Sequence, residues 1–335
     1  VTGVQTCALP IFALGLTSPN PIVGAVVADE NGEVIAEGFH KKSGSEHAEI
    51  AALNAAGHRA RGATLVVTLE PCNHSGKTPP CTDSIIAAGI KRVVFSVADP
   101  NQLAAGGAKK LRDSGIEVIS DVLKDEVAFS NRAWLKKIRS GAPFISLKLA
   151  MSVDGKIAAP DGTSKWITSE ESRRDVARLR SECDAIVTGS GTVLTDNPSL
   201  TVRGISRLTG DFTPTRIILG QREIPSNLKI FDGVAETIHL RSRKLSELIE
   251  LSNSRNWNHV LIEAGPELSS AFIKSGLVDE VIIYQAPILL GGPKSALDDI
   301  GVTNLNSQVR FKITEITRIP GEVDNLRMTL QARSA

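Results

Sequence analysis

The sequence predicts two α/β domains in one chain, and three observations support this fold class. At 335 residues the chain is longer than one hydrophobic core usually supports. Short β-rich runs alternate with helical stretches, which is typical of α/β domains. Residues 140–143, which read Ser-Gly-Ala-Pro, interrupt this alternation. Because Gly and Pro end regular elements, we place one domain over 12–142 and a second over 143–335.

The first eleven residues do not fit the domain that follows them. They have neither a basic start nor a small-residue cleavage site, so a signal peptide is not expected. We interpret residues 1–11 as a non-native leader, followed at 12–16 by the remnant of a shortened opening helix.

The first domain is expected to be a three-layer α/β domain. Its strands are expected at 22–28, 33–39, 64–69, 92–98 and 116–119, and its helices at 47–57, 81–89 and 108–114. Asn31-Gly32 lies between the first two strands, and this dipeptide favours the tight turns of β-hairpins. Residues 120–139 are charged and helical in pattern, and they lead to the domain boundary.

Residues 47–49 and 71–81 carry the signature of a zinc deaminase. His47 supplies a nitrogen ligand, and Cys72 and Cys81 supply two thiolates. A catalytic zinc site typically keeps three protein ligands and a water in the fourth position. The zinc-deaminase signature is H-x-E followed by P-C and a further Cys. Its glutamate, here Glu49, acts as general acid and base without binding the metal. Eight residues separate the two cysteines, whereas the general signature has two.

A structural zinc site, or two buried cysteines, is the alternative interpretation of this motif. A closed structural site needs four ligands, and the candidate fourth ligand, His74, is only two residues from Cys72. Glu49 has no structural role at its spacing, so we favour a catalytic metal. In the alternative, a non-enzymatic zinc-stabilised protein, Glu49→Gln would change nothing measurable.

Composition limits the partners of this chain. Hydrophobic residues make up 41% and charged residues 22%, and the net charge is +1. A deaminase of nucleic-acid bases, with the second half as a binding module, is disfavoured because only 4% of residues are aromatic and no basic excess exists. No apolar run reaches about 18 residues, so no membrane helix is expected. Cys7 and Cys183 are scattered singles, which suits a reducing cytoplasm.

The second domain is also expected to alternate strands and helices. Its strands are expected at 144–150, 184–188, 216–219, 259–263 and 281–284, with a hairpin around Gly321. Thr168 and Glu171 form a predicted capping box for a helix that runs to Cys183. Residues 189–198 lack the third glycine of a G-x-G-x-x-G fingerprint. Residues 263–265 lead directly into an expected helix, and the first backbone N–H groups of that helix could bind a phosphate.

Three further segments carry a family resemblance. Residues 17–24 read Thr-Ser-Pro-Asn-Pro-Ile-Val-Gly, residues 76–80 between the cysteines read Gly-Lys-Thr-Pro-Pro, and residues 99–101 read Asp-Pro-Asn. With the zinc motif, they resemble the bifunctional riboflavin-biosynthesis deaminase/reductase family over residues 13–335. The resemblance implies zinc-dependent deamination of a diaminopyrimidine ribosyl phosphate. It also implies reduction of the ribosyl group to ribityl by NADPH, in a domain with a dihydrofolate-reductase-like fold.

The resemblance also assigns site residues. It implies that the cofactor is lined by Ala150, Trp166, Thr192, Asp196 and Gly265. It implies that the substrate is held by Asn20, Ser164, Arg180, Leu200, Arg203 and Glu263. His40 and Lys77 are further candidates near the substrate, and Asp196 and Lys148 are candidates for the proton donor of the reduction. Family members associate, so a homo-oligomer is expected.

The sequence departs from the family pattern in three places. Residues 102–107 are one residue shorter and lack a lysine between the glycines, which removes one expected phosphate contact. Ala264 stands where the family has a second glycine. Residues 220–222 read Gly-Gln-Arg where the family places a small hydroxyl residue against the NADPH 2′-phosphate. Arg222 is the candidate substitute, so NADPH stays favoured over NADH.

Overall fold

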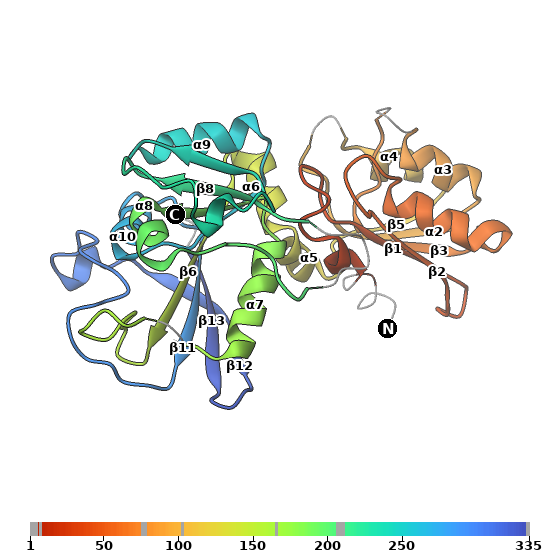
Figure 1. Cartoon of the computed structure of the whole chain (residues 1–335). Helices are drawn as coiled ribbons and strands as arrows, with labels where there is room; N and C mark the ends of the chain where they lie inside the picture. The colour runs from red at the N-terminus through yellow and green to blue at the C-terminus, as the bar shows by residue number, and fades with distance from the viewer. Residues whose placement is uncertain are drawn as a thin grey trace. The chain divides into compact units, whose positions relative to one another are not determined.

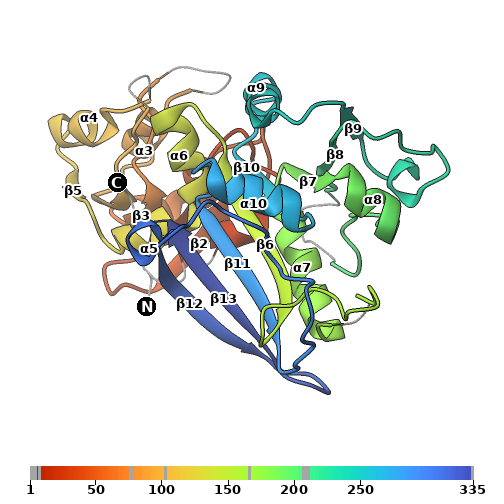
Figure 2. The same cartoon turned by 90° about the vertical axis from the view of Figure 1, so that its left-hand side faces the viewer.

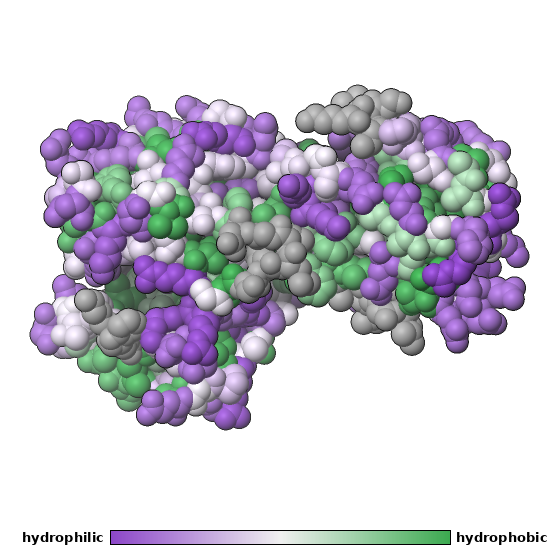
Figure 3. Space-filling view, turned by 45° about the vertical axis from the view of Figure 1, so that its right-hand side comes forward, coloured by the Kyte–Doolittle hydropathy of each residue, from purple (hydrophilic) through white to green (hydrophobic). Residues whose placement is uncertain are grey.

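The computed structural model describes residues 6, 9–74, 79–101, 104–164, 167–205 and 212–332. These residues form two compact units, one up to Ala142 and one from Pro143 onwards, and each unit is built on its own β-sheet (Figure 1). Hydrophilic side chains cover most of the face drawn in Figure 3, with hydrophobic side chains in scattered patches. Within the described ranges, every helix is too short or too polar to cross a membrane.

The first unit contains a five-stranded mixed sheet. Its strands are β1 (Gly24–Ala28), β2 (Val34–Phe39), β3 (Thr64–Leu69), β4 (Arg92–Val97) and β5 (Glu117–Ile119), in the order β2-β1-β3-β4-β5. β1 is antiparallel to β2 and β3, whereas β3, β4 and β5 run parallel to one another. The predicted hairpin is confirmed, and Gly32 in its turn has a φ of 83°, which favours glycine.

Helices of the first unit pack on this sheet around one hydrophobic core. They are η1 (Leu9–Ala13), α2 (Ala48–Ala56), η2 (Gly57–Ala60), α3 (Cys81–Ala87), α4 (Gly107–Asp113), α5 (Lys124–Ser130) and α6 (Arg132–Ser140). α2 approaches β2 so closely that a Cβ atom on Gly38 would lie 2.5 Å from the backbone nitrogen of Ala52. Val127 of α5 and Trp134 of α6 belong to the same core. Of the expected leader, residues 1–5, 7 and 8 lie outside the described residues, and Pro10 is buried.

The second unit contains an eight-stranded sheet. Its strands are β6 (Phe144–Ser152), β7 (Ala185–Gly189), β8 (Thr215–Leu219), β9 (Thr237–Leu240), β10 (His259–Ile262), β11 (Glu280–Ala286), β12 (Phe311–Ile319) and β13 (Asn325–Ala332). They lie in the order β12-β13-β11-β6-β10-β7-β8-β9. The six strands from β11 to β9 are parallel, and the hairpin predicted around Gly321 adds β13 and β12 as antiparallel strands.

Helices cover both faces of this parallel sheet, so its strands are buried on both sides. The helices of this unit are α7 (Glu170–Ser181), α8 (Ser190–Asp196), η3 (Lys229–Phe231), α9 (Leu245–Ser254), α10 (Pro266–Lys274) and η4 (Leu305–Ser307), of which η4 buries no residue. Leu248 of α9 and Phe272 of α10 pack in one core cluster, and Figure 2 shows α10 lying across the strands. Leu179 of α7 and Val193 of α8 pack in a second cluster.

The predicted capping box of α7 is wrong by one residue. The helix begins at Glu170, and its N-cap is Ser169, whose hydroxyl accepts a hydrogen bond from the backbone N–H of Ser172 at 3.2 Å. The amide oxygen of Asn325 in β13 accepts from the backbone N–H of Ser169 at 2.7 Å. This contact, distant in sequence, fixes Ser169 rather than Thr168 at the helix start.

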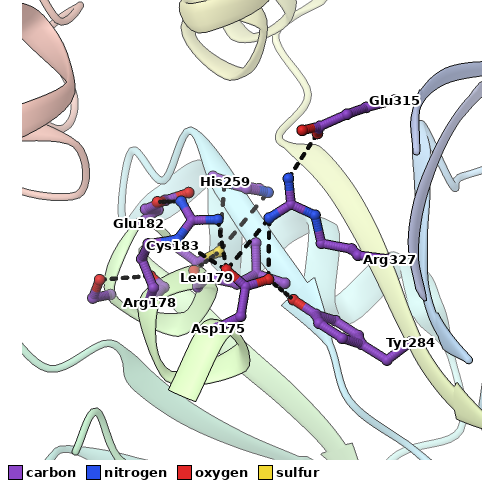
Figure 4. Close-up of polar contacts among 10 residues, drawn as sticks. Asp175, Arg178, Leu179, Glu182, Cys183, His259, Tyr284, Glu315 and Arg327 are labelled. Carbon is purple, nitrogen blue, oxygen red and sulfur yellow. Dashed lines mark hydrogen bonds and ion pairs between the residues drawn. The ribbon is translucent and has the colours of Figure 1, made fainter. Parts of the chain in front are cut away.

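A network of charged side chains joins α7 to the last strands (Figure 4). Asp175 of α7 accepts a hydrogen bond from the buried Tyr284 hydroxyl at 2.7 Å and pairs with Arg327 at 3.0 Å. Arg327 also donates to Glu315 of β12 at 2.7 Å. Burial alone would raise the pKa of Asp175, but Tyr284, Arg178 and Arg327 outweigh it and lower that pKa.

The loop that follows β3 is held by close backbone packing at Gly107. A methyl group on Gly107 would overlap with the carbonyl oxygen of Pro71, the residue before Cys72. The backbone N–H of Asn73 also donates to the Ala104 carbonyl at 3.1 Å. The position of Cys72 therefore depends on a glycine at 107.

Gly107→Ala is expected to destabilise the first unit by about 3 kcal/mol, because an overpacked site must displace its neighbours, and to lower its zinc content. Gly62→Ala is the control, since Gly62 has a φ of +77° and open space around it, so only about 1 kcal/mol of backbone strain is expected. Thermal unfolding and metal analysis of both variants test this. Equal effects of the two substitutions, with zinc retained, would contradict the expected role of Gly107.

Candidate active sites

Three potential metal ligands converge in the first unit. His47 is the N-cap of α2, Cys72 follows the end of β3, and Cys81 is the first residue of α3. Their ligand atoms all lie within 4.8 Å of one another. His47 Nδ1 lies 3.2 Å from Cys81 Sγ and 3.6 Å from Cys72 Sγ. Within the described residues this group has three members, so His74 is not a fourth ligand.

The chemistry of these donors fits zinc. A hydrogen bond from the Cys81 thiol is the main cause that lowers the pKa of Cys72 to about 4, against the opposing effect of burial. The same hydrogen bond and burial raise the pKa of Cys81. Zinc binds thiolates and neutral imidazole, and its binding releases the protons of its ligands. The three residues therefore form a suitable zinc site with three protein ligands, the number that a catalytic zinc typically has.

Glu49 lies beside this cluster in the first turn of α2 and is only 4% exposed. Burial is the main cause that raises the pKa of Glu49, and a hydrogen bond with Cys81 opposes it. A carboxyl group beside the metal ligands can carry protons without binding the metal. Glu49 therefore stays the candidate for the acid and base of this site.

Asn20 reaches the same site through His40. The Asn20 side-chain nitrogen lies 3.4 Å from His40 Nε2, and the His40 ring packs edge-on against the His47 ring at 5.8 Å. Burial lowers the pKa of His40. Lys77, the other expected neighbour of the substrate, lies outside the described residues.

The second unit contains a cavity of about 1080 Å³ at the ends of its parallel strands. Eight of the expected reductase residues line it, namely Ala150, Ser164, Arg180, Thr192, Asp196, Leu200, Glu263 and Gly265. Arg203 is not among the lining residues; it is exposed and donates to Thr201 at 3.1 Å and to Ser199 at 2.5 Å. Trp166 lies outside the described residues.

A buried ion pair forms part of the cavity wall. Glu263 accepts two hydrogen bonds from the Arg180 guanidinium, at 2.6 Å on Oε1 and 2.9 Å on Oε2, and Lys148 Nζ lies 3.1 Å from Oε2. Burial would raise the pKa of Glu263, but the two cations outweigh it and hold that pKa at about 2. Arg180 also donates to the Thr201 carbonyl at 3.2 Å, which fixes the loop that carries Leu200.

The segment before α10 brings backbone close to the cavity. The backbone N–H of Gly265 donates to Thr192 Oγ1 at 3.1 Å, and a Cβ atom on Gly265 would lie 3.4 Å from that oxygen. Ala264 and the first residues of α10 also line the cavity. Helix N-termini of this kind favour anionic groups such as a pyrophosphate. The backbone N–H groups at the start of α10 and the cavity volume of about 1080 Å³ fit a phosphorylated dinucleotide.

For two residues that line the cavity, Lys148 and Arg243, the sequence did not predict the position that the structure shows. Lys148 appeared only as a candidate proton donor, although it forms part of the buried charge cluster with Glu263. Arg243 was not considered, because no motif marks it. Arg243 is identified only by the pairing of β8 with β9. Because these two strands end in register, the segments that follow them both reach the cavity, and Arg222 and Arg243 both line it.

Two protein families match the chain. The cytidine and deoxycytidylate deaminase zinc-binding region matches residues 5–97, and the RibD C-terminal domain matches residues 143–323. The riboflavin biosynthesis protein RibD of Mycobacterium tuberculosis is 43% identical over 306 residues, covering 91% of this chain and 90% of the relative. The Escherichia coli protein of the same name is 40% identical over 342 residues, covering 92% and 93%.

Two solved structures are similar along almost the whole chain. Acinetobacter baumannii RibD superimposes with a TM-score of 0.89 at 38% identity, covering 99% of this chain and 98% of its own. A Thermotoga maritima deaminase/reductase superimposes with a TM-score of 0.89 at 34% identity and the same coverage. The chain belongs to the RibD family and is a bifunctional riboflavin-biosynthesis enzyme, with a zinc-binding deaminase domain followed by an NADPH-dependent reductase domain.

Proposed function

We propose that the first unit deaminates a diaminopyrimidine ribosyl phosphate by hydrolysis, and that the second unit then reduces the ribosyl group of the product to ribityl. The observation that supports this most strongly is the His47–Cys72–Cys81 cluster with buried Glu49 beside it. The Thermotoga maritima relative is described as a diaminohydroxyphosphoribosylaminopyrimidine deaminase and 5-amino-6-(5-phosphoribosylamino)uracil reductase.

In the deaminase unit, His47, Cys72 and Cys81 would hold zinc, which when bound would lower the pKa of a bound water to about 7. Glu49 takes a proton from the water and delivers it to the departing amino group. The oxygen of water becomes bonded to the ring carbon, the carbon–nitrogen bond breaks and ammonia leaves. Asn20 and the His40 ring contact the nucleotide at the edge of this site.

In the reductase unit, the residues that line the cavity divide between two ligands. Ala150, Thr192, Asp196 and Gly265, together with Trp166, contact NADPH, which supplies a hydride when bound. Ser164, Leu200 and the Arg180–Glu263 pair hold the substrate, whereas Arg203, which the family resemblance also assigns to the substrate, is exposed and does not line the cavity. Arg180 donates to both oxygens of Glu263 and to the Thr201 carbonyl, so its remaining N–H donors are oriented for a phosphate or sugar oxygen.

The hydride adds to the ribosyl C1′ as the ring opens, so the ring oxygen needs a proton. Lys148 and Asp196 both line the cavity. We favour Lys148, because an ammonium group has three N–H donors and Glu263 fixes it at 3.1 Å.

We also propose that the enzyme is cytoplasmic and forms a homo-oligomer, and two features support this. Cys72, Cys81 and Cys183 form no disulfide bond within the described residues, which supports a cytoplasmic enzyme. β12 is a nine-residue edge strand with Ile313 and Ile316 more than half exposed. An exposed edge strand can pair with a strand of another chain, which supports a homo-oligomer.

Glu49→Gln is expected to reduce ammonia release by about 10³-fold, because the proton carrier is lost, while zinc binding persists. Bound zinc and ammonia are measured in the same preparation. Glu37→Gln, on the exposed side of β2, is the matched control and should retain full activity. If Glu49→Gln kept wild-type turnover with zinc bound, the assigned role of Glu49 would be wrong.

Glu263→Gln is expected to destabilise the second unit by about 3 kcal/mol at pH 7, because Arg180 and Lys148 lose their buried counter-charge. The folded-state pKa of Glu263, about 2, lies below its ordinary 4.5. Its stabilising effect is therefore full above pH 4.5 and is lost as the pH falls towards 2.

Urea unfolding of the wild type and Glu263→Gln at pH 7 and pH 3 measures this difference. Glu223→Gln, which removes an exposed ion pair with Arg241, is the control and should have little effect at either pH. A Glu263→Gln penalty that grows on acidification would contradict the assigned ion pair.

A further inference from the structure

Three neighbouring strands of the second unit end in register beside the cavity. Gly189, the last residue of β7, is paired with Leu219, the last residue of β8. Leu219 is in turn paired with Leu240, the last residue of β9. The segments that follow these strands therefore leave the sheet at one edge, and residues of all three line the cavity.

Two arginines occupy equivalent positions at this edge. Arg222 is the third residue after Leu219, and Arg243 is the third residue after Leu240. Adjacent strands lie about 4.8 Å apart, so the two side chains start from neighbouring positions, and both line the cavity. Arg222 Nη1 lies 3.5 Å from the place of a Cβ atom on Gly191, in the first turn of α8. Among the described residues, neither guanidinium forms an ion pair.

The acidic group nearest to these arginines in sequence is engaged elsewhere. Glu223 follows Arg222 directly, but its side chain is 87% exposed and pairs with Arg241 at 3.1 Å. Neither Glu223 nor Arg241 lines the cavity. In dinucleotide-binding folds, a carboxylate that follows a strand binds the ribose 2′-hydroxyl of NAD, whereas an arginine accommodates the 2′-phosphate of NADP.

Position 220 cannot supply the hydroxyl group that the family resemblance led us to expect. Gly220 has a φ of +142°, and a Cβ atom there would overlap with the Ser190 side chain. Ser242, the hydroxyl residue after β9, already donates to Glu247 at 2.8 Å. The arginines are therefore the groups at this edge that remain available for an anion.

We propose that Arg222 and Arg243 jointly bind the 2′-phosphate of NADPH and set the preference of this reductase for NADPH over NADH. The inference rests on the proposed reductase function. A guanidinium binds a phosphate through charge-assisted, often bidentate hydrogen bonds. NADH has a hydroxyl group at this position, so the two arginines give it little binding energy.

The test is direct binding of NADPH and of NADH, measured by isothermal titration calorimetry on the full chain. The variants are Arg222→Gln, Arg243→Gln and the double substitution, with Arg241→Gln as the matched control on the same strand end. Each cavity arginine is expected to contribute about tenfold to the NADPH Kd, so the double variant should bind NADPH about 100-fold more weakly. Its NADH affinity, and both affinities of Arg241→Gln, should be unchanged.

Adenosine 2′,5′-bisphosphate and 5′-AMP serve as smaller probes that separate the 2′-phosphate from the nicotinamide. The wild type should bind the bisphosphate more tightly than 5′-AMP. This preference should decrease as the salt concentration rises, because salt screens the contact between the arginines and the 2′-phosphate. The double variant should lose the preference. If the wild type binds neither dinucleotide, the reductase function itself fails. If the double variant binds dinucleotide and still prefers NADPH, or loses NADPH and NADH equally, only the assignment of the two arginines is overturned.

Discussion

Both candidate sites depend on parallel strands that end at a common edge of a sheet. In the first unit β3 and β4 pair up to Leu69 and Val97, so the loops that follow them emerge together. The Glu70 carboxylate joins these loops by accepting the backbone N–H of Asp99 at 3.2 Å and of Ala108 at 2.9 Å. In the second unit the same arrangement lets several strand ends contribute to one cavity, as parallel α/β sheets generally do.

The two sites use buried charge in opposite ways. At the metal cluster, burial raises the pKa of Glu49, which keeps this carboxyl able to exchange a proton. In the cavity, burial acts on Glu263 in the same direction, but Arg180 and Lys148 reverse the effect and keep it ionised. One carboxyl group is therefore suited to move protons, and the other to hold two cations in place.

The metal site was predictable because its residues belong to local motifs, whereas much of the cavity was not. The positions of His47, Cys72 and Cys81 at element ends follow from helix-start and strand patterns in the sequence. Arg243 carries no such signal, because only the register of β9 against β8 places it at the cavity. The start of α7 was predicted one residue too early for a similar reason, since the bond from Ser169 to Asn325 spans 156 residues.

The order of the two reactions is tested most directly by following ammonia and NADPH together, before and after zinc is removed with a chelator. With the diaminopyrimidine ribosyl phosphate as substrate, we predict that zinc removal stops both ammonia release and NADPH oxidation. With the deaminated pyrimidine as substrate, NADPH oxidation should continue at its original rate. NADPH oxidation that persisted on the diaminopyrimidine without zinc would contradict the assignment of deamination to the first unit and of the following reduction to the second.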